Sequence, residues 1–313
     1  MISLAISSLV YLPLPYVQPV FRPPAEASSL ILQVTVGCSW NKCSFCDMYT
    51  QPQQAYRQKS LDEIESDLKL AAELAGAYGQ AVRRVFLADG DAMGQSTARL
   101  ASILEQIQTQ LPTVSRVSSY CLPRNVRGKS VADLRSLQSL GLRTLYVGCE
   151  SGDDEVLRCV GKGETQASSA EALAKLHEAG LKTSVMILHG LGGQALSAQH
   201  VAGSAALIKR APPTYLSTLV VSFPKGSERH AAGFGAEGRC FTPLSTAELL
   251  AEQRALLEQL DGLDASVIFR SDHASNYLPL KGTLPRHRAR LLAELSDAQR
   301  GDLPLRPEWA RGL

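Results

Sequence analysis

Short apolar runs and amphipathic stretches alternate along most of the chain. The apolar runs are rich in β-branched residues and lie near residues 31, 83, 115, 144, 184 and 216. Between and after them, apolar residues recur at helical spacing over residues 60–78, 97–110, 131–140, 167–179 and 198–209. An alternation of strand and helix predicts parallel strands joined by right-handed crossovers. The pattern therefore indicates an α/β fold with six βα units.

The two ends of the chain depart from this pattern. Residues 1–29 are rich in proline and are predicted to form an extended arm. Residues 30–223 hold the six units, and residues 224–313 form an extension. The extension begins with a glycine-rich loop, followed by a helix over 246–260, a short strand over 267–270 and a basic final helix. Its polar segment 271–282 is interpreted as a lid or substrate-contacting segment, with an ordered surface loop as the alternative.

Three cysteines follow the first predicted strand, which ends at Gly37. Cys38, Cys43 and Cys46 are separated by four residues and then by two. Three thiolates can ligate three irons of a [4Fe–4S] cluster and leave the fourth iron open to a small molecule. A structural zinc site would need a distant fourth ligand, because no second CxxC pair or nearby His is present. Unrelated core cysteines are the remaining alternative.

Composition narrows the class of protein. The 313 residues with 45% hydrophobic content are enough for a full core. A net charge of +2 gives no electrostatic case for nucleic-acid binding. We expect no membrane span, because no run of 18 apolar residues occurs, and the apolar N-terminus lacks the basic region of a signal peptide. Seven cysteines on a chain of this size fit free thiols and a reducing, cytoplasmic location.

The cysteine triplet resembles that of the radical S-adenosylmethionine (SAM) superfamily. Phe45 stands where the family carries an aromatic residue before the last cysteine. The family usually has three residues in the first gap, whereas this chain has four. The resemblance implies an incomplete (β/α)6 TIM-like barrel, with ligands bound at the carboxyl ends of the strands.

Three further segments resemble motifs of the same superfamily. Asp89, Gly90 and Asp91 stand in place of its Gly-Gly-Glu motif, which holds the methionine ammonium of SAM. The sequence around Glu150 and Ser151 resembles a GxESG segment of many radical SAM proteins, and the resemblance to the coproporphyrinogen oxidase-like branch implies that these two residues approach SAM. The remaining positions that the resemblance assigns to SAM are Lys162, near its carboxylate, and Gly190, near its adenine. Each of these segments is also explained by an ordinary strand-to-helix turn or a solvated charge.

The resemblance implies a reaction class. A [4Fe–4S] cluster reductively cleaves SAM, and the resulting 5′-deoxyadenosyl radical abstracts hydrogen from a substrate. It also implies an electron donor such as flavodoxin or ferredoxin, and the substrate classes considered are a tetrapyrrole, an RNA base and a peptide. A different class of function stays open at this point: a non-catalytic protein that uses the three cysteines to bind an iron-sulfur cluster or zinc.

Overall fold

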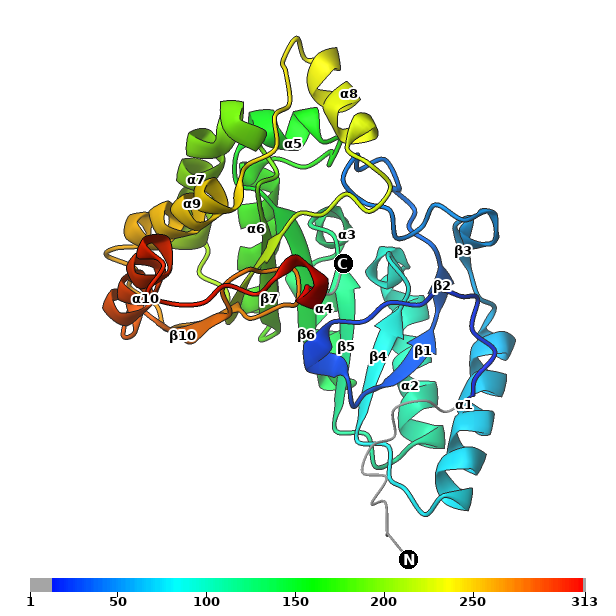
Figure 1. Cartoon of the computed structure of the whole chain (residues 1–313). Coiled ribbons are helices and arrows are strands. Elements are labelled where there is room, and N and C mark those ends of the chain that lie inside the picture. Colours follow the sequence, from blue (N-terminus) through cyan, green and yellow to red (C-terminus); the bar gives the residue numbers. More distant parts are fainter. Residues whose placement is uncertain (1–12, 312–313) are drawn as a thin grey trace, which may run out of the picture.

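One open, mostly parallel sheet forms the centre of the molecule. The computed structural model describes residues 13–311, and its eight-stranded sheet has the order β1-β4-β5-β6-β7-β8-β9-β10 (Figure 1). Neighbouring strands are parallel up to β9, and β10 pairs antiparallel with β9. The strands are β1 (Leu30–Gln33), β4 (Arg84–Ala88), β5 (Arg116–Cys121), β6 (Leu142–Glu150), β7 (Lys182–His189), β8 (Tyr215–Val220), β9 (Val267–Ser271) and β10 (Leu280–Leu284).

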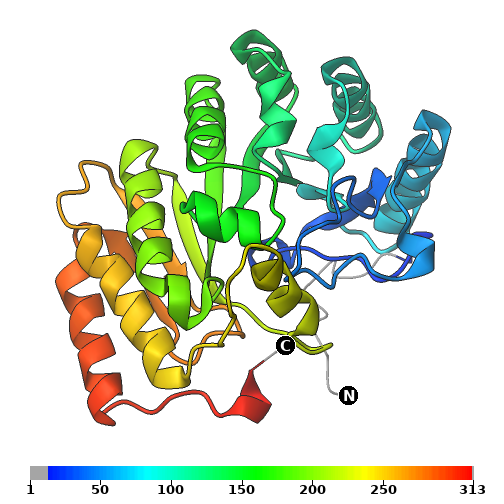
Figure 2. The same cartoon turned by 90° about the horizontal axis from the view of Figure 1, so that it is seen from above.

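The helices form the outer layer of this curved sheet (Figure 2). The long helices are α1 (Leu61–Ala77), α2 (Thr97–Gln110), α4 (Val131–Ser139), α6 (Gln166–Glu178), α7 (Gly193–Arg210), α9 (Thr246–Gln259) and α10 (Arg288–Arg300). A single large apolar core joins them to the outer face of the strands. The predicted partial barrel is therefore confirmed, and its sheet does not close.

Local sequence signals mark the helix ends as expected. Ser60 and Glu63 form a reciprocal capping box at the start of α1. The helix predicted over 97–110 has those bounds, whereas α7 begins at Gly193, five residues before its predicted start. Along β6, Tyr146 faces the concave side, and Cys149 lies in the helix-side core, as strand alternation predicts.

The extension continues the barrel sheet. Strand β9 pairs with β8, and the polar segment 271–282 contains the end of β9 and the start of β10. Asn276 in this segment accepts a hydrogen bond from the Val220 amide at 2.9 Å and donates one to the Thr218 carbonyl at 2.8 Å. The segment is thus fastened to the carboxyl end of β8. Its role as a lid or substrate contact stays a prediction.

The sequence pattern did not predict helix α8 (Glu228–Ala236), nor the short helices α3 (Arg124–Arg127) and α5 (Asp154–Cys159). Helix α8 lies within the segment expected to be a glycine-rich loop. Its residues Gly233 and Gly235 weaken the helical pattern in the sequence. Tertiary packing supports it instead, because Phe234 is fully buried in a small apolar cluster with residues of α5 (Asp154–Cys159) and α7.

The described part of the N-terminal arm, residues 13–29, lies on the concave face of the sheet (Figures 1 and 2). Tyr16 and Val20 pack against an inner cluster that contains Phe86 and Tyr146. The Glu26 carboxylate, which is fully buried, accepts hydrogen bonds from Arg116 and Tyr146. The arm therefore covers apolar surface that the open barrel would otherwise expose.

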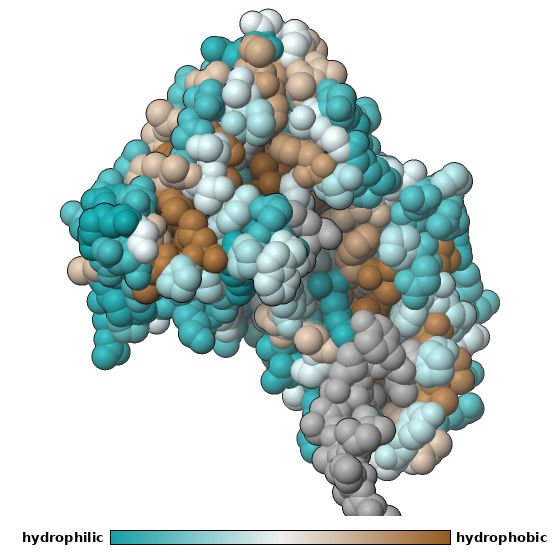
Figure 3. All heavy atoms as spheres, viewed as in Figure 1, coloured by the Kyte–Doolittle hydropathy of each residue, from teal (hydrophilic) through white to brown (hydrophobic). Residues whose placement is uncertain are grey.

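The remaining elements are short. They are η1 (Pro24–Glu26), β2 (Thr35–Val36), η2 (Pro52–Gln54), β3 (Arg57–Gln58), η3 (Ala92–Gly94), α3 (Arg124–Arg127) and η4 (Glu308–Ala310). On the face seen in Figure 3, apolar residues gather in the hollow of the molecule and polar residues cover much of its rim. Within residues 13–311, no helix has the length and apolar character that crossing a membrane requires.

Candidate metal centre and cofactor site

The three cysteines lie in the loop that follows β2, close enough to influence one another electrostatically. All three are half-buried and free of disulfides. Burial raises the pKa of Cys43 to about 11, the Lys162 ammonium lowers it, and the neighbouring Cys46 and Cys38 sulfurs raise it further. Burial also raises the pKa of Cys46. Binding a metal here therefore requires the displacement of protons.

The distances between the three cysteine sulfurs bear on which metal group they could bind. In residues 13–311, only one group of three or more His, Cys, Asp or Glu has its ligand atoms all within 4.8 Å of one another, and it does not include these cysteines. At least one pair of the three Sγ atoms is therefore more than 4.8 Å apart in this structure. Thiolates around one zinc ion are separated by about 3.8 Å, given Zn–S bonds of about 2.3 Å. Three thiols in one loop offer the donor set that a [4Fe–4S] cluster with one open iron requires, and their role as its ligands stays a prediction.

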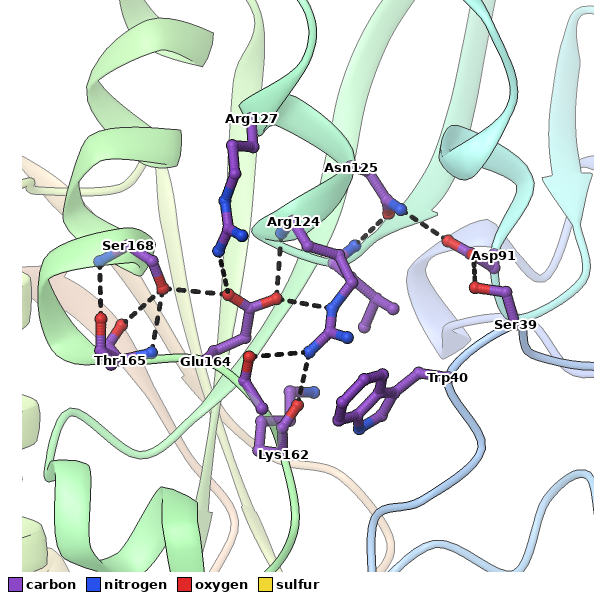
Figure 4. A network of polar contacts seen from close by, with 12 residues as sticks. Ser39, Trp40, Asp91, Arg124, Asn125, Arg127, Lys162, Glu164, Thr165 and Ser168 are labelled. Carbon is purple, nitrogen blue, oxygen red and sulfur yellow. Dashed lines mark hydrogen bonds and ion pairs between the residues drawn. The ribbon is translucent and has the colours of Figure 1, made fainter.

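Trp40 anchors the cysteine loop to the neighbouring strand ends. Its indole N–H donates to the Gly161 carbonyl at 2.8 Å, and the Arg124 guanidinium lies 3.7 Å from its ring centroid. Arg124 in turn binds Glu164 at 2.8 Å and the carbonyls of Lys162 and Gly163 (Figure 4). Sequence reasoning missed Trp40 and Arg124, because no motif marks them and their contact spans more than 80 residues of chain.

The predicted Asp89-Gly90-Asp91 motif lies directly behind the cysteine loop. A Cβ on Gly90 would lie 2.4 Å from the Tyr49 ring and 3.0 Å from the Cys38 Cβ, so this close approach requires glycine. Asp91 accepts hydrogen bonds from Ser39 and, at 2.7 Å, from the Asn125 amide (Figure 4). The motif thus supports the loop.

The Asp89 carboxylate is also hydrogen-bonded to protein side chains. It accepts hydrogen bonds from Gln33 at 3.0 Å and from the Tyr49 hydroxyl at 3.1 Å. Burial raises its pKa to about 6, although the hydrogen bonds from Gln33 and Tyr49 act in the opposite direction. Both aspartates are buried and bonded to protein groups, and their contact with SAM stays a prediction.

Glu150 and Lys162 form an ion pair next to the cysteines. The Lys162 ammonium lies 3.0 Å from a Glu150 carboxylate oxygen and 5.9 Å from the Phe45 ring centroid. Both side chains are largely buried. Burial alone would lower the pKa of Lys162, but Glu150 and Cys43 raise it above its usual value. The structure therefore brings Cys43, Phe45, Glu150 and Lys162 together, and keeps a positive charge beside the thiols.

Ser151 and Gly190 directly follow the carboxyl ends of β6 and β7. The Ser151 hydroxyl contacts His200 Nδ1 at 2.9 Å, and the Gly190 amide donates to Glu252 at 2.7 Å. Gly190 also lines a cavity of about 350 Å³ at the carboxyl end of β8. The other residues that line it are Val220, Val221, Ser222, Phe223, Pro224, Pro243, Leu244, Leu249, Tyr277, Glu308 and Arg311.

Helix α8 covers the cysteine loop. His230 contacts the Ser44 hydroxyl through Nδ1 at 3.0 Å and the Leu191 carbonyl through Nε2 at 3.1 Å. Arg229 forms an ion pair with Asp47 at 2.9 Å. Sequence reasoning placed a loop here, so these contacts were not foreseen.

The fold and site define an open-barrel α/β protein with a three-cysteine centre at the strand ends. The chain belongs to the radical SAM superfamily, whose family model matches residues 32–199. Proteins of this superfamily use a [4Fe–4S] cluster and SAM as cofactors. The family assignment therefore confirms the resemblance seen in the sequence.

Individual relatives are distant. An uncharacterized protein of Methanopyrus kandleri is 25% identical over 166 residues, which are 50% of this chain and 30% of that protein. Coproporphyrinogen III oxidase from Escherichia coli, a radical SAM enzyme, superposes with a TM-score of 0.53 and 18% identity, covering 74% of this chain and 52% of the oxidase. The cobalamin-dependent SAM radical enzyme OxsB superposes with a TM-score of 0.52 and 13% identity, covering 91% of this chain and 38% of OxsB. These likenesses support the fold.

Proposed function

We propose that this protein binds a [4Fe–4S] cluster through Cys38, Cys43 and Cys46 and uses it to cleave SAM. The observation that carries the proposal is the arrangement of the three thiols. They lie in one loop at the strand ends of a superfamily barrel, near enough for the Cys38 and Cys46 sulfurs and the Lys162 ammonium to shift the pKa of Cys43. When bound, such a cluster supplies the electron that generates a 5′-deoxyadenosyl radical for hydrogen abstraction from a substrate.

The residues around the cysteines suit the binding and orientation of SAM. Lys162 offers a buried positive charge for the SAM carboxylate, and Glu150 holds that ammonium in place. Backbone groups of Gly90, beside Cys38, are suited to the methionine end of SAM. Gly190 opens onto the cavity of about 350 Å³, which suits the adenosine end. The barrel would exclude water and align the reacting groups.

The proposal extends to the substrate and partners. Tyr277 of segment 271–282 lines the same cavity as Gly190, and we assign this segment to substrate contact. A tetrapyrrole, an RNA base and a peptide are the candidate substrates, and flavodoxin or ferredoxin is the candidate electron donor. An oxygen-sensitive cluster and free thiols suit a reducing compartment, and we assign the protein to the cytoplasm.

Anaerobic reconstitution tests the proposed activity. We expect about four irons and four sulfides per chain, a brown absorbance band, and 5′-deoxyadenosine released from SAM under dithionite. Cys46→Ala should lose the cofactor and the product. Cys240→Ala is the matched control, because this exposed cysteine lies far from the triplet in sequence, and it should retain both. One tightly held zinc per chain that is lost in Cys46→Ala, with no iron and no SAM cleavage, would instead identify a non-catalytic protein that binds zinc through these cysteines.

Isotope transfer identifies the substrate class. In one experiment, SAM is deuterated at the 5′ position and each candidate substrate is checked for deuterium that it has gained. In the other, each candidate substrate is deuterated and the adenosyl group is checked. We expect transfer with only one class of substrate. Tyr277→Phe should weaken substrate binding and leave uncoupled SAM cleavage unchanged. An equal loss of both would contradict the assignment of segment 271–282.

A further inference from the structure

A second group of metal-binding side chains lies apart from the cysteines. His189 is the last residue of β7, His200 lies in α7, and Glu252 lies in α9. Their ligand atoms all lie within 4.8 Å of one another, and none of the three residues is more than 3% exposed. This is the one group of its kind that residues 13–311 contain. Two imidazoles and a carboxylate, brought together from three elements, form a donor set typical of transition-metal sites.

The two histidines turn toward the same carboxylate oxygen. His189 Nδ1 lies 3.1 Å and His200 Nε2 lies 3.9 Å from Glu252 Oε1. With metal–ligand bonds of about 2.1 Å, tetrahedral ligands are separated by about 3.4 Å. The two observed distances bracket this value. Small side-chain adjustments would therefore place all three ligand atoms around one ion.

An unpartnered nitrogen points to a missing ligand. His200 Nε2 is buried and has no hydrogen-bond partner, because 3.9 Å from Glu252 is too long for a hydrogen bond. His189 Nε2 is also buried without a partner, but it is not the ligand atom of this ring, so the missing ligand is inferred from His200 Nε2. Buried polar atoms without partners are rare in proteins, and each calls for an explanation such as a bound ion.

The surrounding groups resemble the support that metal ligands receive. The other ring nitrogen of His200, Nδ1, lies 2.9 Å from the Ser151 hydroxyl, which holds the orientation of the ring. Ser197 donates to the second oxygen of Glu252, and the Gly190 amide donates to the first at 2.7 Å. Hydrogen bonds of this kind fix the orientation of metal-binding imidazoles and carboxylates.

We propose that His189, His200 and Glu252 bind a divalent transition-metal ion, zinc in the first instance, separate from the cysteine centre. Nitrogen ligands disfavour Ca²⁺ and Mg²⁺, which prefer oxygen, and suit zinc and its neighbours in the first transition series. The ion would join the end of β7 to α7 and α9. It would thereby fix Ser151 and Gly190, the two residues next to its ligands.

Metal analysis of the full chain tests this site independently of SAM chemistry. Protein isolated anaerobically should contain about one zinc per chain in addition to the cluster iron. The triple variant Cys38→Ser/Cys43→Ser/Cys46→Ser should lose iron and keep the zinc. Glu252→Gln and His200→Gln should keep iron and lose zinc. His177→Gln is the matched control, because His177 lies at the end of α6 and bonds Thr183 outside the group.

Cobalt binding tests the site without changing any of its three proposed ligands. Co²⁺ added to the chelator-treated triple cysteine variant should give visible d–d bands without the near-ultraviolet charge-transfer band of a thiolate–cobalt bond. A spectrum of this kind supports an N/O site. Fewer than about 0.1 zinc per wild-type chain, together with no cobalt bands, would overturn the proposal and leave a proton-shared polar network.

Discussion

Lys162 brings a positive charge into the protein interior beside the cysteine loop. Its ammonium is 3.0 Å from Glu150, and their side chains are only 4% and 11% exposed. Exposed ion pairs contribute little to stability, but breaking a buried pair leaves an uncompensated charge in a poor solvent. The two side chains should therefore depend on one another energetically, whatever SAM adds to the site.

Replacing Lys162 by Met should lower the free energy of unfolding by about 3 kcal/mol, because Glu150 is left buried and unpaired. The double variant Glu150→Gln/Lys162→Met should recover at least half of that loss. Urea unfolding under anaerobic conditions measures both. Lys69→Met, which breaks the exposed Lys69–Glu65 pair, is the control and should cost less than about 1 kcal/mol. If the double variant loses as much stability as Lys162→Met and Glu150→Gln lose together when each is made alone, the pair is not coupled.

Gly163 is the second residue on which the cysteine loop depends. Its φ is +69°, and a Cβ there would lie 2.3 Å from the Trp40 ring. Gly163→Ala should destabilise the protein and also weaken cofactor retention, because Trp40 must move. Gly79→Ala is the matched control: its φ is +61°, but its Cβ would meet nothing within 4 Å. It should incur only the backbone cost of about 1–2 kcal/mol and retain the cluster. Equal cluster loss in both variants would contradict a specific role for Trp40.

These residues show how far a single sequence predicts a site. Close spacing along the chain after a predicted strand made Cys38, Cys43 and Cys46 the candidate ligands, and they lie in one loop after β2. The Glu150–Lys162 pair joins two positions 12 residues apart, and both were chosen separately. Trp40 and Arg124 could not be found, because their contact depends on which strand ends become neighbours in the folded barrel.

Helix α8 is the element whose presence depends most on tertiary contacts. It contains two of the glycines that made its segment look like a loop, and it is held by Phe234 and His230 against the cysteine loop. By contrast, α2 was predicted with its observed bounds, because its periodic apolar residues and Ser96 cap are local signals. Elements that depend on distant partners are the ones that sequence periodicity misses.

The docking of α8 should depend on pH through His230. Burial lowers the pKa of His230 to about 4 from 6.5, so the folded state keeps the ring neutral. Its contribution to stability is then complete above pH 6.5 and is lost as the pH falls toward 4. Between pH 7 and pH 5, the wild type should lose roughly 2 kcal/mol more than His230→Gln in urea unfolding. The reason is that glutamine keeps an N–H donor and does not titrate.

Hydrogen exchange locates the pH effect. The amides of α8 and of the loop around Ser44 should exchange faster at pH 5 than the intrinsic pH dependence of exchange predicts, and those of α2 should not. Because the other histidines are present in both backgrounds, they cancel in the comparison with His230→Gln. Identical pH profiles for the two proteins would rule out His230 as the titrating group.

At the scale of the whole molecule, the open barrel exposes a concave face that its own N-terminal segment covers. The sheet does not close, so the side chains of Phe86 and Tyr146 on its inner face would be exposed to solvent if no other segment covered them. Tyr16 and Val20 supply apolar contact, and Glu26 fixes the segment across β5 and β6. The parallel arrangement of the strands was predicted from the alternation of strands and helices. The position of the N-terminal segment on the concave face was not, because a proline-rich segment carries no periodic signal.

Glu26 is therefore expected to stabilise the barrel as a whole. Glu26→Ala should lower the free energy of unfolding by about 3 kcal/mol, because Arg116 and the buried Tyr146 hydroxyl lose their acceptor. Amides of residues 16–33 should exchange faster with solvent, while those of α9 and α10 keep their protection. Glu73→Ala, on the exposed side of α1, should change neither measurement. If Glu26→Ala lowers stability and leaves the exchange of residues 16–33 unchanged, the carboxylate acts only on Arg116 and Tyr146, and other contacts hold the arm on the sheet.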